Sequence, residues 1–321
     1  MEHGHDLPWR RAIVLVVLAA LATAALYDLV PRLAGAGDAW ARLRGGDPGW
    51  LAAAFAFEVL SFGGYVLLFR AVLGDGWFGW RVSLLITFAG VAMTRMLAAG
   101  GAGGIALTAW ALKRAGRDSR QVAVDLSAFL VTLYSVFMAA MLVGALGLWS
   151  GLFPGDAPVA LTLPAAAVGA GVIAAALLLA RSGSERRIAR DAAAGIRRAI
   201  ELVRGHDARL LGAVGWWAFD VAVLWSCLEA FGDAPSAAVT VTAYFVGMLG
   251  NLLPLPGGVG GVDGAMIGAL IGFGVAPGLA IVGVLAYRVF AFWLPTVAGI
   301  PACAELIRVA RRWEATTQPI R

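Results

Sequence analysis

Long apolar runs joined by short polar connections constrain the fold of this sequence more than any other feature. A run of about 20 apolar residues is long enough to cross the roughly 30 Å hydrocarbon core of a bilayer as a helix. Six runs of this kind occur, at 12–30, 49–69, 122–149, 158–180, 210–231 and 278–300. Only 14% of the 321 residues are charged, whereas soluble domains carry about 25%. We therefore predict an all-α polytopic membrane protein with six full spans.

Two further apolar segments, 82–112 and 237–276, are interrupted by clusters of glycine and proline. The interruptions are Gly100, Gly101, Gly103 and Gly104 in the first segment, and Pro254, Pro256, Gly257, Gly258, Gly260 and Gly261 in the second. The return arm of the first, residues 105–112, would be only about 12 Å long as a helix. Such an arm is too short to cross the bilayer, so we predict that each segment forms a re-entrant hairpin.

The two interrupted segments also indicate an internal repeat. Both contain the pattern Gly-Gly-x-Gly-Gly, and Ala-Phe-Glu-Val at 56–59 resembles Ala-Phe-Asp-Val at 218–221. Because inverted repeats with broken helices are typical of transporters, we predict that 49–149 and 210–300 are inverted repeats, each made of span, hairpin and span. The alternative is chance recurrence in a chain with 42 glycines.

The basic residues are distributed asymmetrically between the two sides of the predicted topology. With residues 1–11, 70–81, 113–120, 181–209 and 301–321 on the cytoplasmic side, that side holds 20 of the 25 basic residues and the opposite side holds three. Cytoplasmic loops of membrane proteins are enriched in Lys and Arg. The count therefore predicts a multi-pass protein of the inner (plasma) membrane with both termini cytoplasmic, the tail 301–321 among the cytoplasmic parts. Since the bases flank apolar spans, they indicate contact with a membrane and no nucleic-acid partner.

Residues 150–209 are predicted to link the repeats through one span and a basic amphipathic helix at 184–204. Apolar residues recur there at helical spacing, at Ile188, Ala192, Ile196, Ile200 and Val203, and arginines fill much of the remaining surface. Such a helix lies in the membrane interface and is attracted to anionic lipids. Its partner is then the anionic cytoplasmic leaflet. The alternative is that the arginines only fix the topology.

Five charged residues lie inside apolar segments: Glu58, Arg95, Asp220, Asp263 and Arg288. A charge at the centre of a membrane helix costs about 2.5–3.5 kcal/mol on insertion scales. These side chains must therefore pair, face water or change protonation. Three acids and two bases allow two ion pairs with one acid left over. They form either a polar pathway, in which arginine meets phosphate through paired hydrogen bonds, or structural pairs.

Motifs of intramembrane enzymes are not present in the sequence. We find no His-Glu-x-x-His motif, no Gly-x-Ser-x-Gly motif and no nucleotide-binding loop. The two cysteines, Cys227 and Cys303, lie in or beside apolar runs and indicate neither a disulfide framework nor a cysteine metal site. We therefore predict no catalytic residue, no cofactor and no metal.

The second interrupted segment reads Asn-Leu-Leu-Pro-Leu-Pro-Gly-Gly-Val-Gly-Gly-Val-Asp-Gly at 251–264. It resembles the signature of a flippase-like membrane domain family, which is named for the transmembrane region of lysylphosphatidylglycerol synthase. Ala-Tyr-Arg-Val-Phe at 286–290 resembles the last span of that family, which carries a Tyr-Arg pair. The resemblance implies a stand-alone member without the soluble synthase domain. The chain departs from the family at Asp263, where Glu is more common, and in the first hairpin, which lacks a proline.

Together, these features predict a flippase-like transporter that moves a polar, phosphate-bearing or anionic lipid between leaflets. Its partners would be membrane phospholipids. Association of the chain with copies of itself, as a homo-oligomer, is left open by the sequence. The alternative is a non-catalytic membrane scaffold or accessory subunit of a lipid- or glycan-modifying enzyme. The predicted substrate-binding residues are Arg288, Asp263, Gly257, Gly258, Gly260, Gly261, Pro256, Asn251, Arg95, Gly100, Gly101, Glu58 and Asp220. We expect Arg288 to line a cavity near the hairpin turns, paired with Asp263, Glu58 or Asp220.

Overall fold

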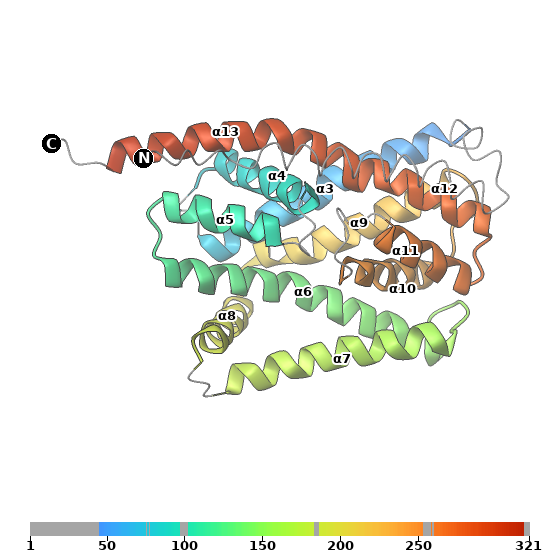
Figure 1. The fold of residues 1–321 in the computed structure, drawn as a ribbon. Coiled ribbons are helices and arrows are strands. Elements are labelled where there is room, and N and C mark those ends of the chain that lie inside the picture. Colours follow the sequence, from blue (N-terminus) through green and yellow to red (C-terminus); the bar gives the residue numbers. More distant parts are fainter. Residues whose placement is uncertain are drawn as a thin grey trace, which may run out of the picture.

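The computed structural model is helical throughout the residues that it describes, with no strand among them (Figure 1). The described residues are 45–74, 76, 78–96, 102–182, 186–252, 258 and 260–317. The prediction of an all-α polytopic membrane protein is confirmed. The predicted first span, 12–30, lies outside the described residues.

Five of the six predicted spans correspond to long apolar helices. They are α3 (Pro48–Leu73), α6 (Ser119–Trp149), α7 (Val159–Arg181), the unit of η1 (Ala208–Leu211) and α9 (Gly212–Glu229), and the unit of α12 (Pro277–Arg288), η4 (Val289–Trp293) and α13 (Leu294–Thr317). Each is long and apolar enough to cross a membrane. The last unit continues as a helix through residues 301–317, so the predicted tail begins inside α13.

The starts of these helices follow ordinary capping chemistry. The Asp47 carboxylate accepts hydrogen bonds from the amides of Gly49 (2.7 Å) and Trp50 (3.1 Å), and Pro48 occupies the first turn of α3. Asp118 caps α6 in the same way. Because these side chains satisfy amides that have no partner within the helix, they fix where each span begins.

The two interrupted segments form pairs of short helices that pack against each other. They are α4 (Trp80–Met96) with α5 (Ala102–Arg114), and α10 (Ala237–Met248), extended by η2 (Leu249–Leu252), with α11 (Gly261–Gly272). The 12 residues of α10 or α11 give a helix of about 18 Å, well short of a bilayer core of roughly 30 Å. Figure 1 shows the two hairpins at opposite ends of the bundle.

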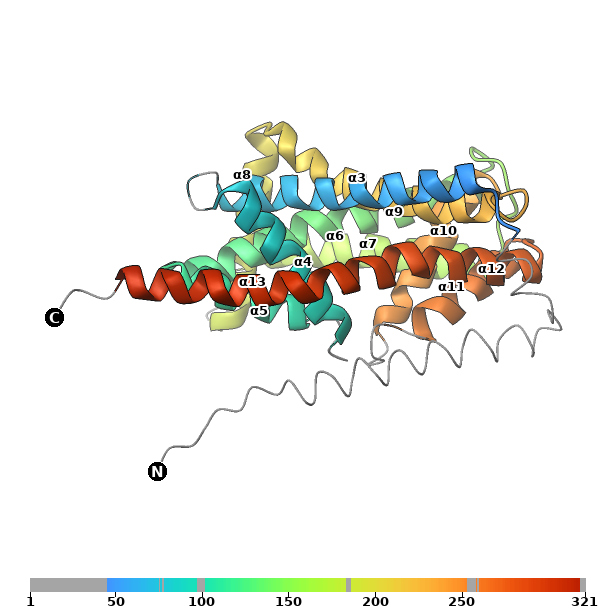
Figure 2. The same cartoon turned by 90° about the horizontal axis from the view of Figure 1, so that it is seen from above.

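The two halves of the chain pack in matching ways around a central pair, α3 and α9. The first arm of each hairpin packs on the closing helix of the other half, α4 on α13 and α10 on α6. Seen from above, α4 bridges between α3 and α13 (Figure 2). Each half therefore contributes a hairpin to the packing of the other half.

Helix α8 (Arg187–Arg204) is the predicted amphipathic helix. It runs across the direction of α6 and α7 (Figure 1) and packs against both. Ala193, Ile196 and Ala199 are buried, whereas Ile188 is 86% exposed and Val203 is 58% exposed. Neighbouring helices therefore cover the middle of the apolar face of α8, whereas its two ends, at Ile188 and Val203, are exposed.

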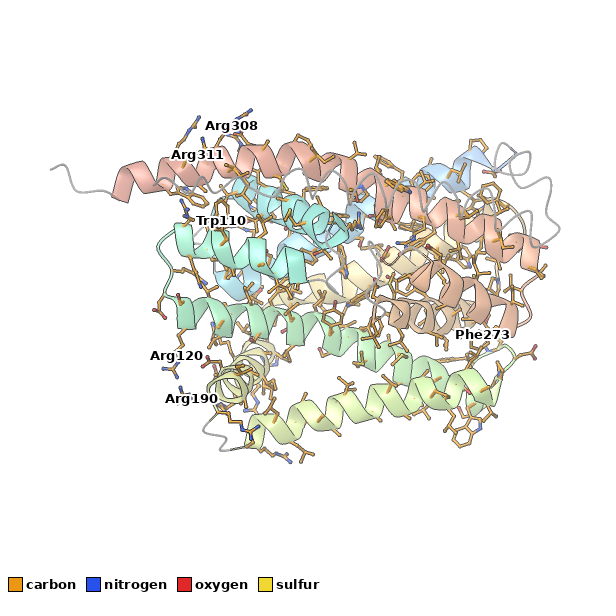
Figure 3. The ribbon with its side chains drawn as sticks, in the orientation of Figure 1. Trp110, Arg120, Arg190, Phe273, Arg308 and Arg311 are labelled. Carbon is orange, nitrogen blue, oxygen red and sulfur yellow. The ribbon has the colours of Figure 1, made fainter. Side chains whose placement is uncertain are left out.

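The basic residues of the described ranges gather at one end of the bundle. Arg120, Arg190, Arg308 and Arg311 are labelled there in Figure 3, and Phe273 marks the other end. Among the described residues, every Lys and Arg except Arg95 and Arg288 lies at this end, near the end of α3, α5, α7 or α13, near the start of α4, α6 or α9, or on α8. The charge asymmetry of the sequence is therefore an asymmetry of the fold.

Candidate substrate-binding site

A cavity of about 490 Å³ lies between the two hairpins. It is lined from the first hairpin by Arg95 and Gly104, from the second by Asn251 and Gly258, and from α9 and α12 by Asp220 and Arg288. Aromatic side chains make up much of the remaining wall, including Tyr65, Trp216, Trp217, Tyr287 and Phe292. The chain thus brings residues of both halves to one polar cavity within an apolar bundle.

Arg288, at the end of α12, forms an ion pair with Asp263 in the first turn of α11. Both residues are buried, with 8% and 2% of their surfaces exposed. The second carboxylate oxygen of Asp263 accepts a hydrogen bond from the Gly260 amide at 2.9 Å. Gly260 has φ +82°, a backbone conformation that favours glycine. The expected pairing of Arg288 is therefore observed, and the glycine turn fixes the carboxylate that holds it.

Arg95 donates hydrogen bonds to backbone carbonyls. Its guanidinium donates to the carbonyl of Phe292 at 2.7 Å and to that of Ala291. Both carbonyls belong to η4, a π-helical turn directly after Arg288. A π turn breaks the regular helical hydrogen-bond pattern, and such turns are frequent at functional sites. Of the two ion pairs that the sequence allows, the described part of the chain forms the one between Arg288 and Asp263, and Arg95 forms none there.

The ring of Phe292 lies near both cavity arginines. The guanidinium carbon of Arg95 is 5.3 Å from the ring centroid, and that of Arg288 is 4.8 Å away. The two guanidinium groups therefore lie within about 10 Å of each other, each in range of a cation–π interaction. This spacing allows both cations to act on one bound headgroup.

Asp220 lines the cavity from α9 and accepts hydrogen bonds from two tyrosines. One donor is the hydroxyl of Tyr244 on α10, and the other is the hydroxyl of Tyr287 on α12, at 3.3 Å. All three side chains are buried. Two neutral donors stabilise a buried carboxylate without neutralising its charge.

Glu58, on α3, is also buried, but it does not line the cavity. Its Oε2 atom makes no hydrogen bond. In the described ranges, neither Glu58 nor Asp220 forms an ion pair, whereas Asp263 does. The structure thus separates the three predicted acids into one that forms an ion pair and two that form none with the described residues.

The predicted turn residues have different positions. Gly258 and Asn251 line the cavity, while Gly260 and Gly261 lie at the start of α11. Four predicted residues, Gly100, Gly101, Pro256 and Gly257, lie outside the described residues.

In each hairpin the two arms approach closely at a glycine. A Cβ on Gly104 would lie 2.6 Å from the Gly90 carbonyl oxygen, and one on Gly250 would lie 2.6 Å from the Val262 amide nitrogen. Cβ atoms do not tolerate such distances, so only glycine allows these arms to pack. The recurring glycine clusters therefore have a packing role in both halves.

Several residues of the site were missed by sequence reasoning. Tyr244 and Phe292 contact Asp220 and the arginines, yet their positions resemble ordinary apolar positions of membrane helices, and Tyr287 was noted only as part of the Tyr-Arg pair at 287–288. A usable signal was present for the tyrosines, because a buried phenol hydroxyl usually finds a hydrogen-bond partner. No feature of the sequence indicated the π turn at 289–293. Among the described residues, no group of three or more His, Cys, Asp or Glu side chains could hold a metal ion.

Comparison with known proteins identifies the family. The family described as the transmembrane region of lysylphosphatidylglycerol synthase matches residues 11–299. The chain belongs to this family. Its members include the membrane part of a lipid-modifying protein, which links the chain to lipid handling.

Two curated relatives match shorter stretches. Both are UPF0104 membrane proteins of Methanothermobacter thermautotrophicus. One is 33% identical over 91 residues, which is 28% of this chain and 26% of the relative. The other is 30% identical over 87 residues, 27% of this chain and 26% of the relative. The chain thus matches about a quarter of the length of each relative.

Proposed function

We propose that this protein moves a phosphate-bearing lipid between the leaflets of a membrane, with the headgroup held in the cavity between the hairpins. The observation that carries the proposal is the presence of Arg95 and Arg288 on the wall of one cavity in the apolar bundle. The guanidinium group matches phosphate oxygens through paired hydrogen bonds. We infer from the same residues that the chain binds its lipid without transforming it.

The size of the cavity fits a headgroup. Pockets for small ligands have volumes of roughly 300–1,000 Å³, and the cavity of about 490 Å³ lies in that range. Tyr134 lines it from the middle of α6 and is 47% exposed. Ile105, on α5, also lines the cavity and is 39% exposed. In the proposed route, a headgroup enters beside these side chains while the acyl chains stay in the bilayer.

Exchange of partners would let the headgroup bind at low cost. In the resting structure the carboxylate of Asp263 neutralises Arg288, and carbonyl oxygens hold Arg95. A phosphate can replace the carbonyl oxygens at Arg95 and share Arg288 with Asp263, so that neither the cations nor the Asp263 carboxylate is left unpaired in the low-dielectric interior. The matched packing of the hairpins supports the predicted repeats, 49–149 and 210–300, as the two parts that would move against each other.

We also propose that the basic end of the bundle faces the cytoplasm of a cell whose inner membrane holds the protein. The rule that cytoplasmic loops are rich in Lys and Arg supports this orientation. Both termini would then be cytoplasmic. The exposed arginines of α8 would lie against the anionic lipids of that leaflet, with Ile188 reaching toward the acyl region.

Reconstitution into vesicles tests this function. Lipids carrying a fluorescent acyl chain are added in three forms: phosphatidylglycerol, phosphatidylcholine, and glucosylceramide, which has no phosphate. Loss of outer-leaflet fluorescence on reduction with dithionite measures translocation. We expect the protein to translocate the two phospholipids. Glucosylceramide should cross the membrane no faster than it does in vesicles without protein.

Variants connect the activity to the cavity. Arg288→Lys and Arg95→Lys keep the charge but lose the planar group, so translocation should fall roughly tenfold, the equivalent of about 1.4 kcal/mol. Arg311→Lys changes an exposed arginine on α13 and should match the wild type. Equal transport of all three lipids, or normal rates in both cavity variants, would overturn the proposal.

A further inference from the structure

Two acidic residues occupy corresponding positions in the central helix pair. Glu58 lies on α3 and Asp220 lies on α9, within the matching sequences at 56–59 and 218–221. The preceding residues, Phe57 and Phe219, stack with their ring centroids 6.0 Å apart. The matching sequences therefore meet in space, and the two carboxyl groups influence each other electrostatically.

The charged groups around these acids do not balance when all of them are ionised. Asp263 neutralises Arg288, which leaves Arg95 as the single cation for Glu58 and Asp220 within the part of the chain that the structure describes. Two ionised carboxylates would then leave one excess negative charge inside the bundle. A buried charge without a partner is far more costly than a buried neutral group. One proton shared by the two acids removes the excess.

Few other groups face this pair. Glu58 interacts with Asp220 and Cys227 on α9, Arg95 on α4 and Tyr287 on α12. Asp220 faces Arg95 as well, and it also faces Arg288 on α12 and the hydroxyls of Tyr244 and Tyr287. The thiol and the phenols are neutral near pH 7, and arginine stays charged. The carboxyls are therefore the groups of this set that can gain or lose a proton near neutral pH.

The contacts of the two acids assign the proton in the resting state. Asp220 accepts two hydrogen bonds from tyrosine hydroxyls, which stabilise a carboxylate. Glu58 is 4% exposed and its Oε2 has no hydrogen-bond partner, so ionisation there would be the more costly. Glu58 thus holds the proton at rest, and Asp220, on the cavity wall, is free to bind a second one.

We propose that Glu58 and Asp220 form a proton-binding pair that couples lipid movement to proton movement. This inference rests on the proposed function. A phosphodiester headgroup adds one negative charge beside Asp220, and one proton then binds to the Asp220 carboxylate. The loaded cavity has the same net charge as the empty one. When the headgroup leaves on the other side, the Asp220 carboxyl releases the proton there, so one proton moves with each monoanionic headgroup.

Proton uptake on binding tests the coupling directly. The purified full chain in detergent and weak buffer is mixed with dihexanoyl phosphatidylglycerol, whose phosphodiester does not titrate near pH 7. A pH dye reports proton uptake and calorimetry reports binding. We expect the wild type to take up one proton per bound lipid. Asp220→Asn should bind the lipid without taking up a proton, and Glu229→Gln, at the far end of the same helix, should match the wild type.

A vesicle experiment gives the second readout. With the membrane potential clamped at zero by potassium and valinomycin, an acid interior or exterior should drive net movement of fluorescent phosphatidylglycerol in the wild type. Glu58→Gln and Asp220→Asn should show movement that does not respond to the pH gradient. If a variant fails to fold, the response of wild-type lipid movement to the pH gradient still tests the coupling by itself.

The outcomes separate the two proposals. Binding that depends on Arg288 but takes up no proton, or transport indifferent to the gradient, overturns the coupling and leaves lipid translocation standing. Equal lipid binding by Arg288→Lys and the wild type would show that Arg288 does not bind the phosphate. That result would contradict both the translocation proposal and the proton coupling.

Discussion

Arg95 of α4 and Phe292 of η4 contact each other in two ways. The guanidinium donates a hydrogen bond to the Phe292 carbonyl at 2.7 Å and also lies 5.3 Å from the centroid of the phenyl ring. The two residues come from opposite halves of the chain, so this contact joins the first hairpin to the closing helix of the second half.

The contact predicts that Arg95 stabilises the protein as well as the cavity. Arg95→Met removes the charged donors to Ala291 and Phe292, and each hydrogen bond to a charged group contributes about 1.5–3 kcal/mol. We expect a loss of about 3–6 kcal/mol in unfolding free energy by the same accounting. Thermal or SDS-induced unfolding in detergent measures it. A variant as stable as the wild type would show that the contact makes no net contribution to the free energy of unfolding.

The crossing of α3 and α9 predicts a sharp difference between two adjacent glycines. A Cβ on Gly64 would lie 2.7 Å from the Gly212 carbonyl oxygen, whereas one on Gly63 meets nothing within 4 Å. Gly64→Ala should therefore destabilise the protein by about 1–3 kcal/mol through overpacking. Gly63→Ala is the matched control and should leave stability the same or slightly higher, since alanine favours helix. Equal melting temperatures for the two variants would contradict the close crossing.

The ion pair of Asp263 and Arg288 predicts a strong coupling between the two positions. Asp263→Leu or Arg288→Met alone leaves a buried charge without its partner, which costs about 3–5 kcal/mol. The double variant should be more stable than either single variant, because it leaves neither charge. A double-mutant cycle of unfolding free energies measures the coupling. Additive losses would mean that the two side chains act independently.

The gathering of bases at one end predicts the orientation of the protein in the cell. In a background of Cys227→Ala and Cys303→Ser, single cysteines replace Arg311 at the basic end and Asp156 at the other end. An impermeant thiol reagent applied to intact cells should label the cysteine at 156 and leave the one at 311 unlabelled until the membrane is opened. The reverse pattern would invert the proposed topology.

The sequence predicted the helices well because the solvent imposes them. Backbone groups in hydrocarbon must bond within the segment, so apolar runs of sufficient length become helices regardless of tertiary contacts. The same reasoning located the breaks near residues 100 and 257, where glycines and prolines interrupt the runs. Exact bounds were harder, since α13 continues well past residue 300.

The site was predicted only in part because pairing depends on three-dimensional contacts. Sequence distance suggested that Arg288 could reach Asp263, and it does. For Arg95 the sequence allowed an ion pair with one of the acids, because only side chains were counted as partners. Its actual acceptors are carbonyls that a π turn presents. Backbone irregularity of this kind arises from packing and leaves no mark in residue type.

The π turn of η4 also sets the rotational phase of the helix that follows it. One residue of an α-helix corresponds to about 100° of rotation, so a helix that accommodates an extra residue in a wider turn presents a different side afterwards. Before η4, the helix turns Tyr287 and Arg288 to the cavity, and after it Gly299 lies against Phe88 of α4. Regular α-helical hydrogen bonding through 289–293 with no residue removed would rotate α13 by about 100° about its axis. A single polypeptide segment therefore serves two unrelated surfaces, and the wide turn sets which side of α13 faces α4.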